Sequence, residues 1–212
     1  MGRIYDATWG RLSAAAYDWF LGSSERAGLS DLRRELVSSA TGRTIEIGAG
    51  TGLNLAHYPE VSELVLAEPD RHMAKHLRTR VTDSLRMADV VQAPGEDLPF
   101  PDDSFDTAVV TLVLCTAPQP ERVLAEIARV LVPGGRLLFM EHVRSDDARV
   151  ARWQDRLHRP WKAFGNGCHC NRTTLATIEA SPFEVMSVEH GEFPKAPPLV
   201  RPLIVGSALA PS

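Results

Sequence analysis

The sequence lacks the features that mark secreted and membrane-spanning proteins. Its 212 residues include three cysteines, Cys115, Cys168 and Cys170, an odd and sparse set that does not form a secreted disulfide framework. Nowhere do about 18 apolar residues run together, as a spanning helix needs. The start, MGRIYDATWG, has no basic region followed by an apolar one, as a signal peptide would. We therefore expect a cytoplasmic protein without stable membrane insertion.

An excess of basic charge is also missing. Lys and Arg number 23 against 27 Asp and Glu, so the formal net charge is −4 and no basic field attracts nucleic acid. Hydrophobic residues make up 44% and charged residues 24%, which excludes disordered and fibrous classes. The composition favours a globular protein that does not have nucleic acid as its partner, and it leaves the oligomeric state open.

Two common nucleotide-binding signatures are absent. No Gly-Lys-Ser/Thr follows any glycine run, which excludes a P-loop. The run Gly48, Gly50, Gly52 is followed by Leu53, where the dinucleotide fingerprint needs a glycine. A nicotinamide oxidoreductase is therefore disfavoured.

From residue 44 onward, short apolar runs alternate with helical segments. This alternation is typical of βαβ units around a mainly parallel sheet, so we predict an α/β fold. The strands are expected over 44–47, 63–67, 85–92, 105–112, 135–142, 183–190 and 203–209. Helices are expected within 1–40 and over 53–57, 71–81, 121–131 and 147–164. No linker or repeat divides the chain, which predicts one domain over 1–212.

The glycine run lies directly after a predicted strand and before a helix. Without Cβ atoms, the backbone of such a loop turns tightly and approaches a ligand closely, and the following helix offers free N–H groups. After the next strand, Glu68 and Asp70 place carboxylates at its carboxyl end. A nucleoside ribose needs a paired acceptor there, so Glu68 is predicted to bind the two ribose hydroxyls. The alternative is that both residues only form a turn and a helix cap.

Five short motifs in order carry a family resemblance. They are Glu46-x-Gly48-x-Gly50-x-Gly52, Glu68, Gly95-Glu96-Asp97-Leu98-Pro99-Phe100, Phe105-Asp106 and Leu131-x-Pro133-Gly134-Gly135. Over about residues 41–142 the chain resembles the class I S-adenosylmethionine-dependent methyltransferases. The resemblance implies a Rossmann-like seven-stranded sheet with helices on both faces and an antiparallel last strand. It also implies a helical N-terminal lid (1–40), a cofactor-binding core (41–142) and a substrate-side region (143–212).

The same resemblance implies which residues hold S-adenosylmethionine and release S-adenosylhomocysteine. The three glycines would hold its methionine part, Glu68 the ribose, and Gly95, Glu96 and Asp97 the adenine edge, with Tyr17 as a lid residue. Many relatives have an Asp where Pro94 stands, so backbone groups or Asp97 would take over its contact with adenine. The remaining residues implied in the cofactor site are Glu46, Ala49, Thr51, Asn54, Pro69, Thr111 and Leu112.

A narrower resemblance rests on Thr111-Leu-Val-Leu-Cys115, Phe139-Met-Glu-His142 and Pro160-Trp161-Lys162 leading to Gly165-x-Gly167-Cys168. This combination is similar to the small methyltransferase-like thiol methyltransferases, which are membrane-associated in mammals and begin with a hydrophobic anchor that this sequence lacks. It implies in-line methyl transfer to a small, rather apolar acceptor, with a thiol as nucleophile. A lipid, quinone or amine acceptor and a non-catalytic cofactor-binding module are the alternatives.

Three residues are candidates for catalysis. His142 and His169 can favour an acceptor thiolate, and Glu141 can orient either ring or act as a base. The alternative for His142 is a structural histidine at a strand end, and Cys115 is expected to be a packed side chain rather than a nucleophile. We expect no metal at Cys168-His169-Cys170, because a tetrahedral structural site wants a fourth ligand and usually wider cysteine spacing.

Overall fold

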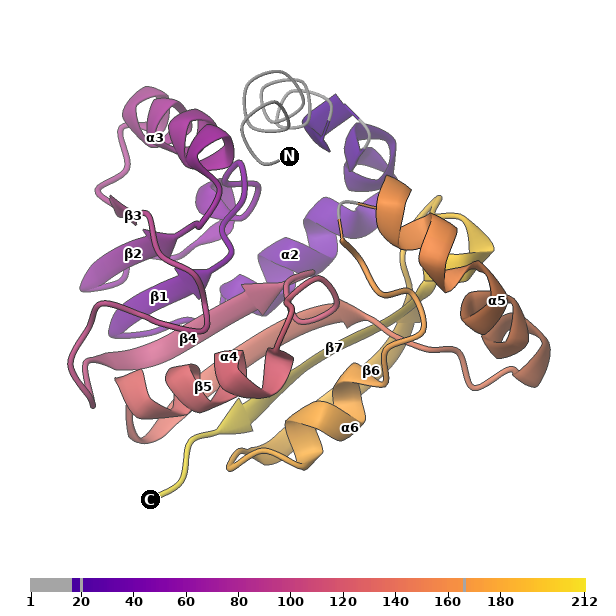
Figure 1. Ribbon diagram of the computed structural model, residues 1–212. Helices are drawn as coiled ribbons and strands as arrows, with labels where there is room; N and C mark the ends of the chain where they lie inside the picture. Colours follow the sequence, from indigo (N-terminus) through magenta and orange to yellow (C-terminus); the bar gives the residue numbers. More distant parts are fainter. Residues whose placement is uncertain (1–16, 20, 166) are drawn as a thin grey trace, which may run out of the picture.

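The computed structural model describes residues 17–19, 21–165 and 167–212, and its centre is a seven-stranded sheet in the order β3-β2-β1-β4-β5-β7-β6 (Figure 1). The first five strands in this order are parallel, and β7 runs antiparallel to both β5 and β6. The predicted α/β fold with an antiparallel last strand is confirmed. The strands are β1 (Arg43–Ile47), β2 (Glu63–Ala67), β3 (Asp89–Val91), β4 (Phe105–Thr111), β5 (Leu131–His142), β6 (Glu184–Glu192) and β7 (Pro202–Leu209).

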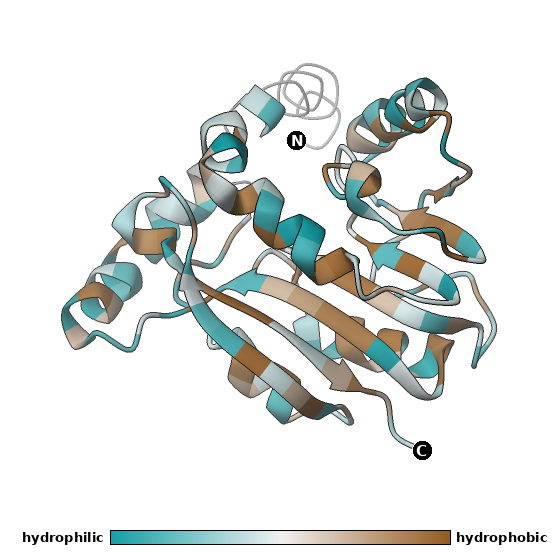
Figure 2. Ribbon diagram, turned by 180° about the vertical axis from the view of Figure 1, so that it is seen from behind, coloured by the Kyte–Doolittle hydropathy of each residue, from teal (hydrophilic) through white to brown (hydrophobic). Residues whose placement is uncertain are grey.

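Helices cover both faces of the sheet. Figure 1 shows α4 and α6 on one face, and the opposite view in Figure 2 shows α2 on the other. Within the described residues, no helix is both long and apolar enough to cross a membrane. The helices are α2 (Ser30–Val37), α3 (Arg71–Ser84), α4 (Pro120–Val130), α5 (Ala148–Phe164) and α6 (Thr174–Glu179), with a π-helical turn η1 (Glu25–Leu29) and 3₁₀ turns η2 (Leu55–His57) and η3 (Pro198–Val200).

The central strands are apolar on both sides because each face packs against helices. On β1, Ile45 and Ile47 belong to the core shared with α4 and α6. On the neighbouring strand, Leu64 and Leu66 belong to the opposite core, shared with α2 and α3. Figure 2 shows the hydrophobic colours concentrated along the strands. This double burial fixes the strands, and with them the loops at their carboxyl ends.

The third strand is shorter than predicted, and one helix was not predicted. Residues 85–88 do not extend the strand, because Leu85 ends α3 in a left-handed conformation at φ 56° and the main chain must turn after it. Pairing with β2 begins only at Asp89. The helix α6 has six residues, which is too short for a clear apolar period.

Candidate active site

The glycine loop leaves β1 at the point where the sheet reverses its direction of growth, between β2 on one side and β4 on the other. Gly48 has φ +67°, and a Cβ there would lie 2.6 Å from Val113, in the loop after β4. Gly50 also has positive φ, at +58°, but a Cβ there would meet no atom within 4 Å. The loop therefore packs tightly at Gly48 and is open over Gly50, as approach by a ligand requires.

The carboxylate of Glu68 lies against this loop. One oxygen accepts a hydrogen bond from the Gly50 N–H at 2.8 Å, and the other accepts from the Asp70 N–H at 2.8 Å. Burial raises the pKa of Glu68 above its ordinary value. Asp70 instead caps α3 by accepting from the N–H groups of His72 and Met73. The sequence left open that Glu68 and Asp70 only form a turn and a helix cap. Asp70 does form this cap, whereas Glu68 faces the glycine loop.

Below the loop, Glu46 is a buried carboxylate on β1. Its two oxygens accept hydrogen bonds from Asn54 Nδ2 at 2.9 Å and from the Tyr58 hydroxyl at 2.8 Å. Burial raises the pKa of Glu46 to about 7. Asn54 Nδ2 also donates to Thr111 Oγ1 at 3.0 Å, at the end of β4. Three residues predicted for the cofactor site, Glu46, Asn54 and Thr111, therefore share one buried network.

Arg33, on α2, is the cation of this network. Its Nη1 donates to Asn54 Oδ1 at 2.9 Å and to Thr111 Oγ1 at 3.2 Å, and its Nε donates to Glu25 at 2.9 Å. Its relative exposure is 3%. Arg33 was not predicted from the sequence as a site residue, although it shares the apolar face of its helix with Leu29 and Val37, four residues away on either side. A charged residue in a helix's apolar stripe was the available signal.

The N-terminal lead-in reaches the glycine loop. Asp18 accepts a hydrogen bond from Thr51 Oγ1 at 2.5 Å and pairs with Arg80 on α3 at 2.6 Å. Burial raises the pKa of its neighbour Tyr17 to about 12, and Arg33 and Cys115 are among the charged or ionisable groups near that ring. The segment predicted as a lid therefore contacts the glycine loop at Asp18, and its residues 1–16 and 20 lie outside the described residues.

The predicted adenine segment forms a turn after β3. The Asp97 N–H donates to the Pro94 carbonyl at 3.2 Å, and a Cβ on Gly95 would lie 2.8 Å from Ile47 on β1. The side chain of Asp97 is exposed and that of Glu96 is partly buried. Pro69 is also exposed at the surface after β2. The turn is thus held close to the end of β1.

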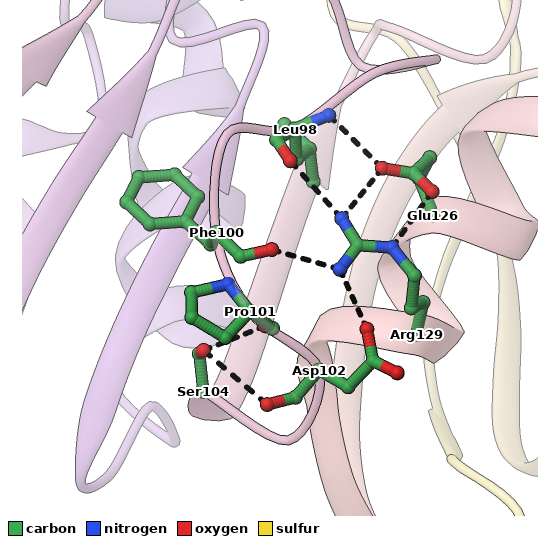
Figure 3. Close-up of polar contacts among 7 residues, drawn as sticks. All are labelled: Leu98, Phe100, Pro101, Asp102, Ser104, Glu126 and Arg129. Carbon is green, nitrogen blue, oxygen red and sulfur yellow. Dashed lines mark hydrogen bonds and ion pairs between the residues drawn. The ribbon is translucent and has the colours of Figure 1, made fainter.

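A single arginine fixes the chain that follows this turn (Figure 3). Arg129 on α4 donates to the carbonyls of Leu98 and Phe100 at 3.0 and 2.8 Å and pairs with Asp102 at 2.8 Å. It also pairs with Glu126 at 2.8 Å, and Glu126 in turn accepts from the Leu98 N–H at 3.0 Å. Arg129 and Glu126 were not predicted as site residues, because in the sequence they are polar residues of an amphipathic helix.

Two residues predicted for the cofactor site, Ala49 and Leu112, make main-chain hydrogen bonds to the neighbouring strands. The Ala49 N–H donates to the Ala67 carbonyl at 3.0 Å, which ties the glycine loop to the end of β2. Leu112 has φ +60° while its N–H donates to the Met140 carbonyl at 2.8 Å. A left-handed leucine is uncommon and costs conformational energy, and such positions cluster at functional sites.

A cluster of thiols and an imidazole lies at the carboxyl ends of β4 and β5. His142 Nε2 lies 2.7 Å from Cys168 Sγ, and the Trp161 indole N–H donates to the same sulfur at 3.1 Å. Cys115, Cys168 and His142 are buried, at 1%, 7% and 6% exposure. A hydrogen bond from Cys115, with the contacts to His142 and Trp161, lowers the pKa of Cys168. These four side chains define the sulfur cluster.

The other two predicted catalytic residues lie beside the sulfur cluster. Glu141 accepts from the N–H groups of Val113, Leu114 and Cys115 at 2.8, 2.9 and 3.1 Å, so its carboxylate holds the loop after β4. The ring of His169 lies against His158 of α5, with 3.2 Å between Nδ1 and Nε2. Of the two predicted catalytic histidines, His142 has its ring in the sulfur cluster and His169 does not.

An open α/β sheet with a glycine loop at its switch point and an adjoining carboxylate is typical of proteins that bind a nucleotide or nucleoside cofactor. Residues 45–139 match the model of a family described as a methyltransferase domain. Among solved structures, an S-adenosylmethionine-dependent methyltransferase from Thermotoga maritima, described as a possible histamine N-methyltransferase, superposes with a TM-score of 0.70 at 22% identity. The match covers 98% of each chain.

Curated relatives narrow the family further. Human thiol S-methyltransferase TMT1B is 36% identical over 193 residues, which cover 84% of this chain and 78% of the relative. Human thiol S-methyltransferase TMT1A is 32% identical over 197 residues, covering 91% and 81%. The chain belongs to the S-adenosylmethionine-dependent methyltransferases, in the same family as these two proteins. It is a methyltransferase, and S-adenosylmethionine is its cofactor.

Proposed function

We propose that this methyltransferase acts on the sulfur of a small, rather apolar thiol. The observation that carries the acceptor class is the relation to two thiol S-methyltransferases over more than four-fifths of the chain. The sulfur cluster agrees with it, since a ring nitrogen and an indole N–H already approach a sulfur atom in this part of the molecule. Hydrogen-bond donors of this kind stabilise a thiolate more than they stabilise a neutral amine.

The residues at the glycine loop fit the cofactor. Gly50 faces open space, and the neighbouring Glu68 carboxylate can accept further hydrogen bonds beside those from Gly50 and Asp70. We assign the ribose hydroxyls to Glu68, the methionine part to the glycine loop and the adenine edge to residues 95–97. When bound, S-adenosylmethionine supplies a methyl group on a sulfonium centre that a nucleophile can take from the opposite side.

The chain's own contribution is alignment and exclusion of water. An in-line transfer needs a nucleophile held on one line with the reacting carbon, and positioning of this kind supplies much of the rate. The packing of Val113 against Gly48 brings the loop that carries Cys115 next to the cofactor loop. Tyr17 and Asp18 cover the same place from the lead-in. The acceptor sulfur would lie between these loops and lose its proton to solvent or to a neighbouring group as the new sulfur–carbon bond forms.

Within this proposal, His142 is the catalytic residue beside the acceptor sulfur. Glu141 is a positioning residue, because its carboxylate holds three main-chain N–H groups of the loop that ends at Cys115. The His169 main chain also holds this loop, by donating to the Cys115 carbonyl at 2.8 Å. A direct catalytic role for Glu141 or His169 stays a prediction.

The test combines binding and turnover in the same sample. Calorimetry with S-adenosylmethionine and S-adenosylhomocysteine measures the cofactor site, and mass spectrometry then follows methylation of a small alkyl thiol. The alcohol and the amine with the same alkyl group are the matched acceptors. We expect both cofactor forms to bind and only the thiol to be methylated, with one S-adenosylhomocysteine formed for each thioether.

Two outcomes would contradict the proposal. Methylation of the amine in preference to the thiol would move the acceptor to nitrogen. Cofactor binding without methylation of any of the three acceptors would contradict a small alkyl thiol as substrate and favour the non-catalytic module. In either case, the assignment of the cofactor site would stand.

A further inference from the structure

Three potential metal ligands from distant parts of the chain meet in the sulfur cluster. Cys115 Sγ, one ring nitrogen of His142 and Cys168 Sγ all lie within 4.8 Å of one another, and all three side chains are buried. They come from the loop after β4, the end of β5 and the loop after α5. In the part of the chain that the structure describes, this is the one group of its kind.

Two thiols and one imidazole suit Zn²⁺ in particular. Zinc binds cysteine sulfur at about 2.3 Å and histidine nitrogen at about 2.0–2.1 Å, and catalytic zinc sites have three protein ligands and one open position. In a tetrahedron with these bond lengths, the ligand atoms lie roughly 3.5–3.8 Å apart. The separations of up to 4.8 Å are close to this range, and the 2.7 Å contact between His142 and Cys168 would have to widen by roughly 0.8 Å.

The surroundings hold the ligands as an outer shell of a metal site does. Glu141 fixes the Cys115 loop through its main-chain N–H groups, and the His169 N–H donates to the Cys115 carbonyl at 2.8 Å. This second bond ties the loop of Cys115 to the segment that carries Cys168. The Trp161 N–H donates to Cys168 Sγ at 3.1 Å, a contact that stabilises a metal-bound thiolate.

The ring of His142 has no oxygen or nitrogen partner among the described residues. Its Nε2 contacts only the Cys168 sulfur, and its buried Nδ1 makes no hydrogen bond there. A buried ring is ordinarily satisfied at both nitrogens. A cation bound between Nε2 and the two sulfurs would engage the ring and both thiols together, which the single contact between Nε2 and Cys168 does not do.

We propose that Cys115, His142 and Cys168 bind a zinc ion whose fourth position takes the acceptor thiol as a thiolate. The metal site stands on the cluster alone, whereas the role of its fourth position rests on the proposed function. On zinc binding, the two cysteines release their protons, and an arriving thiol releases its own to solvent as its sulfur joins the metal. In this arrangement His142 is a metal ligand and not a proton acceptor.

This metal site was not expected from the sequence, where no metal was predicted at the triplet Cys168-His169-Cys170. In the structure, only Cys168 of that triplet joins the cluster, since the His169 ring lies against His158 and Cys170 Sγ contacts the Gln154 carbonyl at 3.6 Å. The partners of Cys168 are instead supplied by the ends of β4 and β5.

Cobalt is the spectroscopic probe, used with the reduced full-length protein. We expect one Co²⁺ to bind per chain, with sulfur-to-cobalt charge-transfer absorption and the visible bands of four-coordinate cobalt, both lost when Zn²⁺ is added. Because the chain has three cysteines, Cys170→Ser is the matched control and should keep the spectrum. Cys115→Ser and Cys168→Ser should each lose about half of the charge-transfer absorption, since one of two thiolates is gone.

Absence of charge-transfer absorption in the wild-type protein would overturn the metal site, as would equal spectra in all three serine variants. If Cys115→Ser or Cys168→Ser fails to fold, alkylation of the wild-type protein replaces that comparison. Zn²⁺ should then slow alkylation of Cys115 and Cys168 at least severalfold while leaving Cys170 unchanged, as resolved by peptide mass spectrometry. Equal protection of all three cysteines, or of none, would contradict the site.

The fourth position has a separate test. Adding the small alkyl thiol to the cobalt protein should increase the charge-transfer absorption by about half, from two sulfur ligands to three, and the matched alcohol should not. Cobalt binding without this increase would overturn the role of the open position. An increase without any methylated product in the zinc enzyme would instead contradict the proposed function, so the two failures are distinguishable.

Discussion

The two halves of the active site are built differently. On the cofactor side, at the ends of β1 and β2, the glycine loop itself is held by contacts that use its main chain, as where the Gly50 N–H meets Glu68 at 2.8 Å. On the acceptor side, at the ends of β4 and β5, side chains from three distant segments converge at Cys115, His142 and Cys168. A site of the first kind tolerates change in its surroundings, whereas a site of the second kind depends on the packing of the whole domain.

Arg33 connects the two sides through Asn54 and Thr111, so we expect its replacement to have the largest effect on the free energy of unfolding. Arg33→Met would leave Glu25 and Asn54 without their buried cation, and breaking such a group costs about 3 kcal/mol or more of the free energy of unfolding. Chemical denaturation measures this loss. Arg34→Met is the matched control, because the side chain of Arg34 is 62% exposed and its ion-pair partner among the described residues is exposed Asp31. Equal losses in the two variants would show that Arg33 does not hold the network.

Glu46 gives the cofactor side a pH dependence of stability. Its pKa is about 7 in the folded protein against an ordinary 4.5, so the folded state binds this proton more tightly than the unfolded state. Stability from this group is present at acid pH and lost as the pH rises from about 4.5 to about 7, at roughly 1.4 kcal/mol per pH unit and about 3 kcal/mol in all.

Glu46→Gln removes the ionisation and keeps a polar side chain for Asn54 and Tyr58. We therefore expect the free energy of unfolding of the variant to fall less steeply than that of the wild type between pH 5 and pH 7. Urea denaturation at a series of pH values measures both slopes. Parallel curves for the two proteins would contradict the assignment of this pH dependence to Glu46.

Glu68 tests whether the cofactor side can be changed separately, since we expect its loss to affect cofactor binding and leave the acceptor side intact. Glu68→Ala should weaken S-adenosylmethionine binding by about 1–3 kcal/mol, roughly 5-fold to 150-fold in Kd, through loss of charged hydrogen bonds. Calorimetry measures the affinity, and circular dichroism checks the fold. Glu63→Gln is the control, at the start of the strand β2 that ends just before Glu68, where Glu63 pairs with Arg43. An unchanged Kd for Glu68→Ala would refute the ribose assignment.

Arg129 has the smallest expected effect and tests how far the cofactor side depends on side chains. Arg129→Met removes the anchors on the Leu98 and Phe100 carbonyls (Figure 3), which should cost about 1 kcal/mol of stability and weaken cofactor binding about twofold to threefold. Arg122→Met, on the exposed face of the same helix, is the control. A loss of thiol specificity in Arg129→Met would show that the two sides are not independent.

The same contrast explains what the sequence could predict. The strand Glu63–Ala67 was predicted at its observed limits, because its apolar run is a local pattern. Glu68 lies beside Gly50 because the parallel strands β1 and β2 end at the same edge of the sheet. The start of β3 and the sulfur cluster depend on tertiary contacts that no local pattern contains. Arg33 is intermediate: its place in an apolar helix face was visible, but its partners on η1 and β4 were not.

We expect the acceptor side to be the last part of the domain to be completed, because the strand β7 follows the other strands of the sheet in the sequence. It lies between β5 and β6, and its residues Gly206 and Leu203 pair with Phe139 and His142. Until this late segment is in place, β5 has an unpaired edge, and pairing over so long a sequence separation is slow. During synthesis the nascent chain can therefore assemble its glycine loop and Glu68 while the strand that carries His142 still exposes one side to other chains. The acceptor half is then where a folding assistant or an aggregation partner has the longest opportunity to bind.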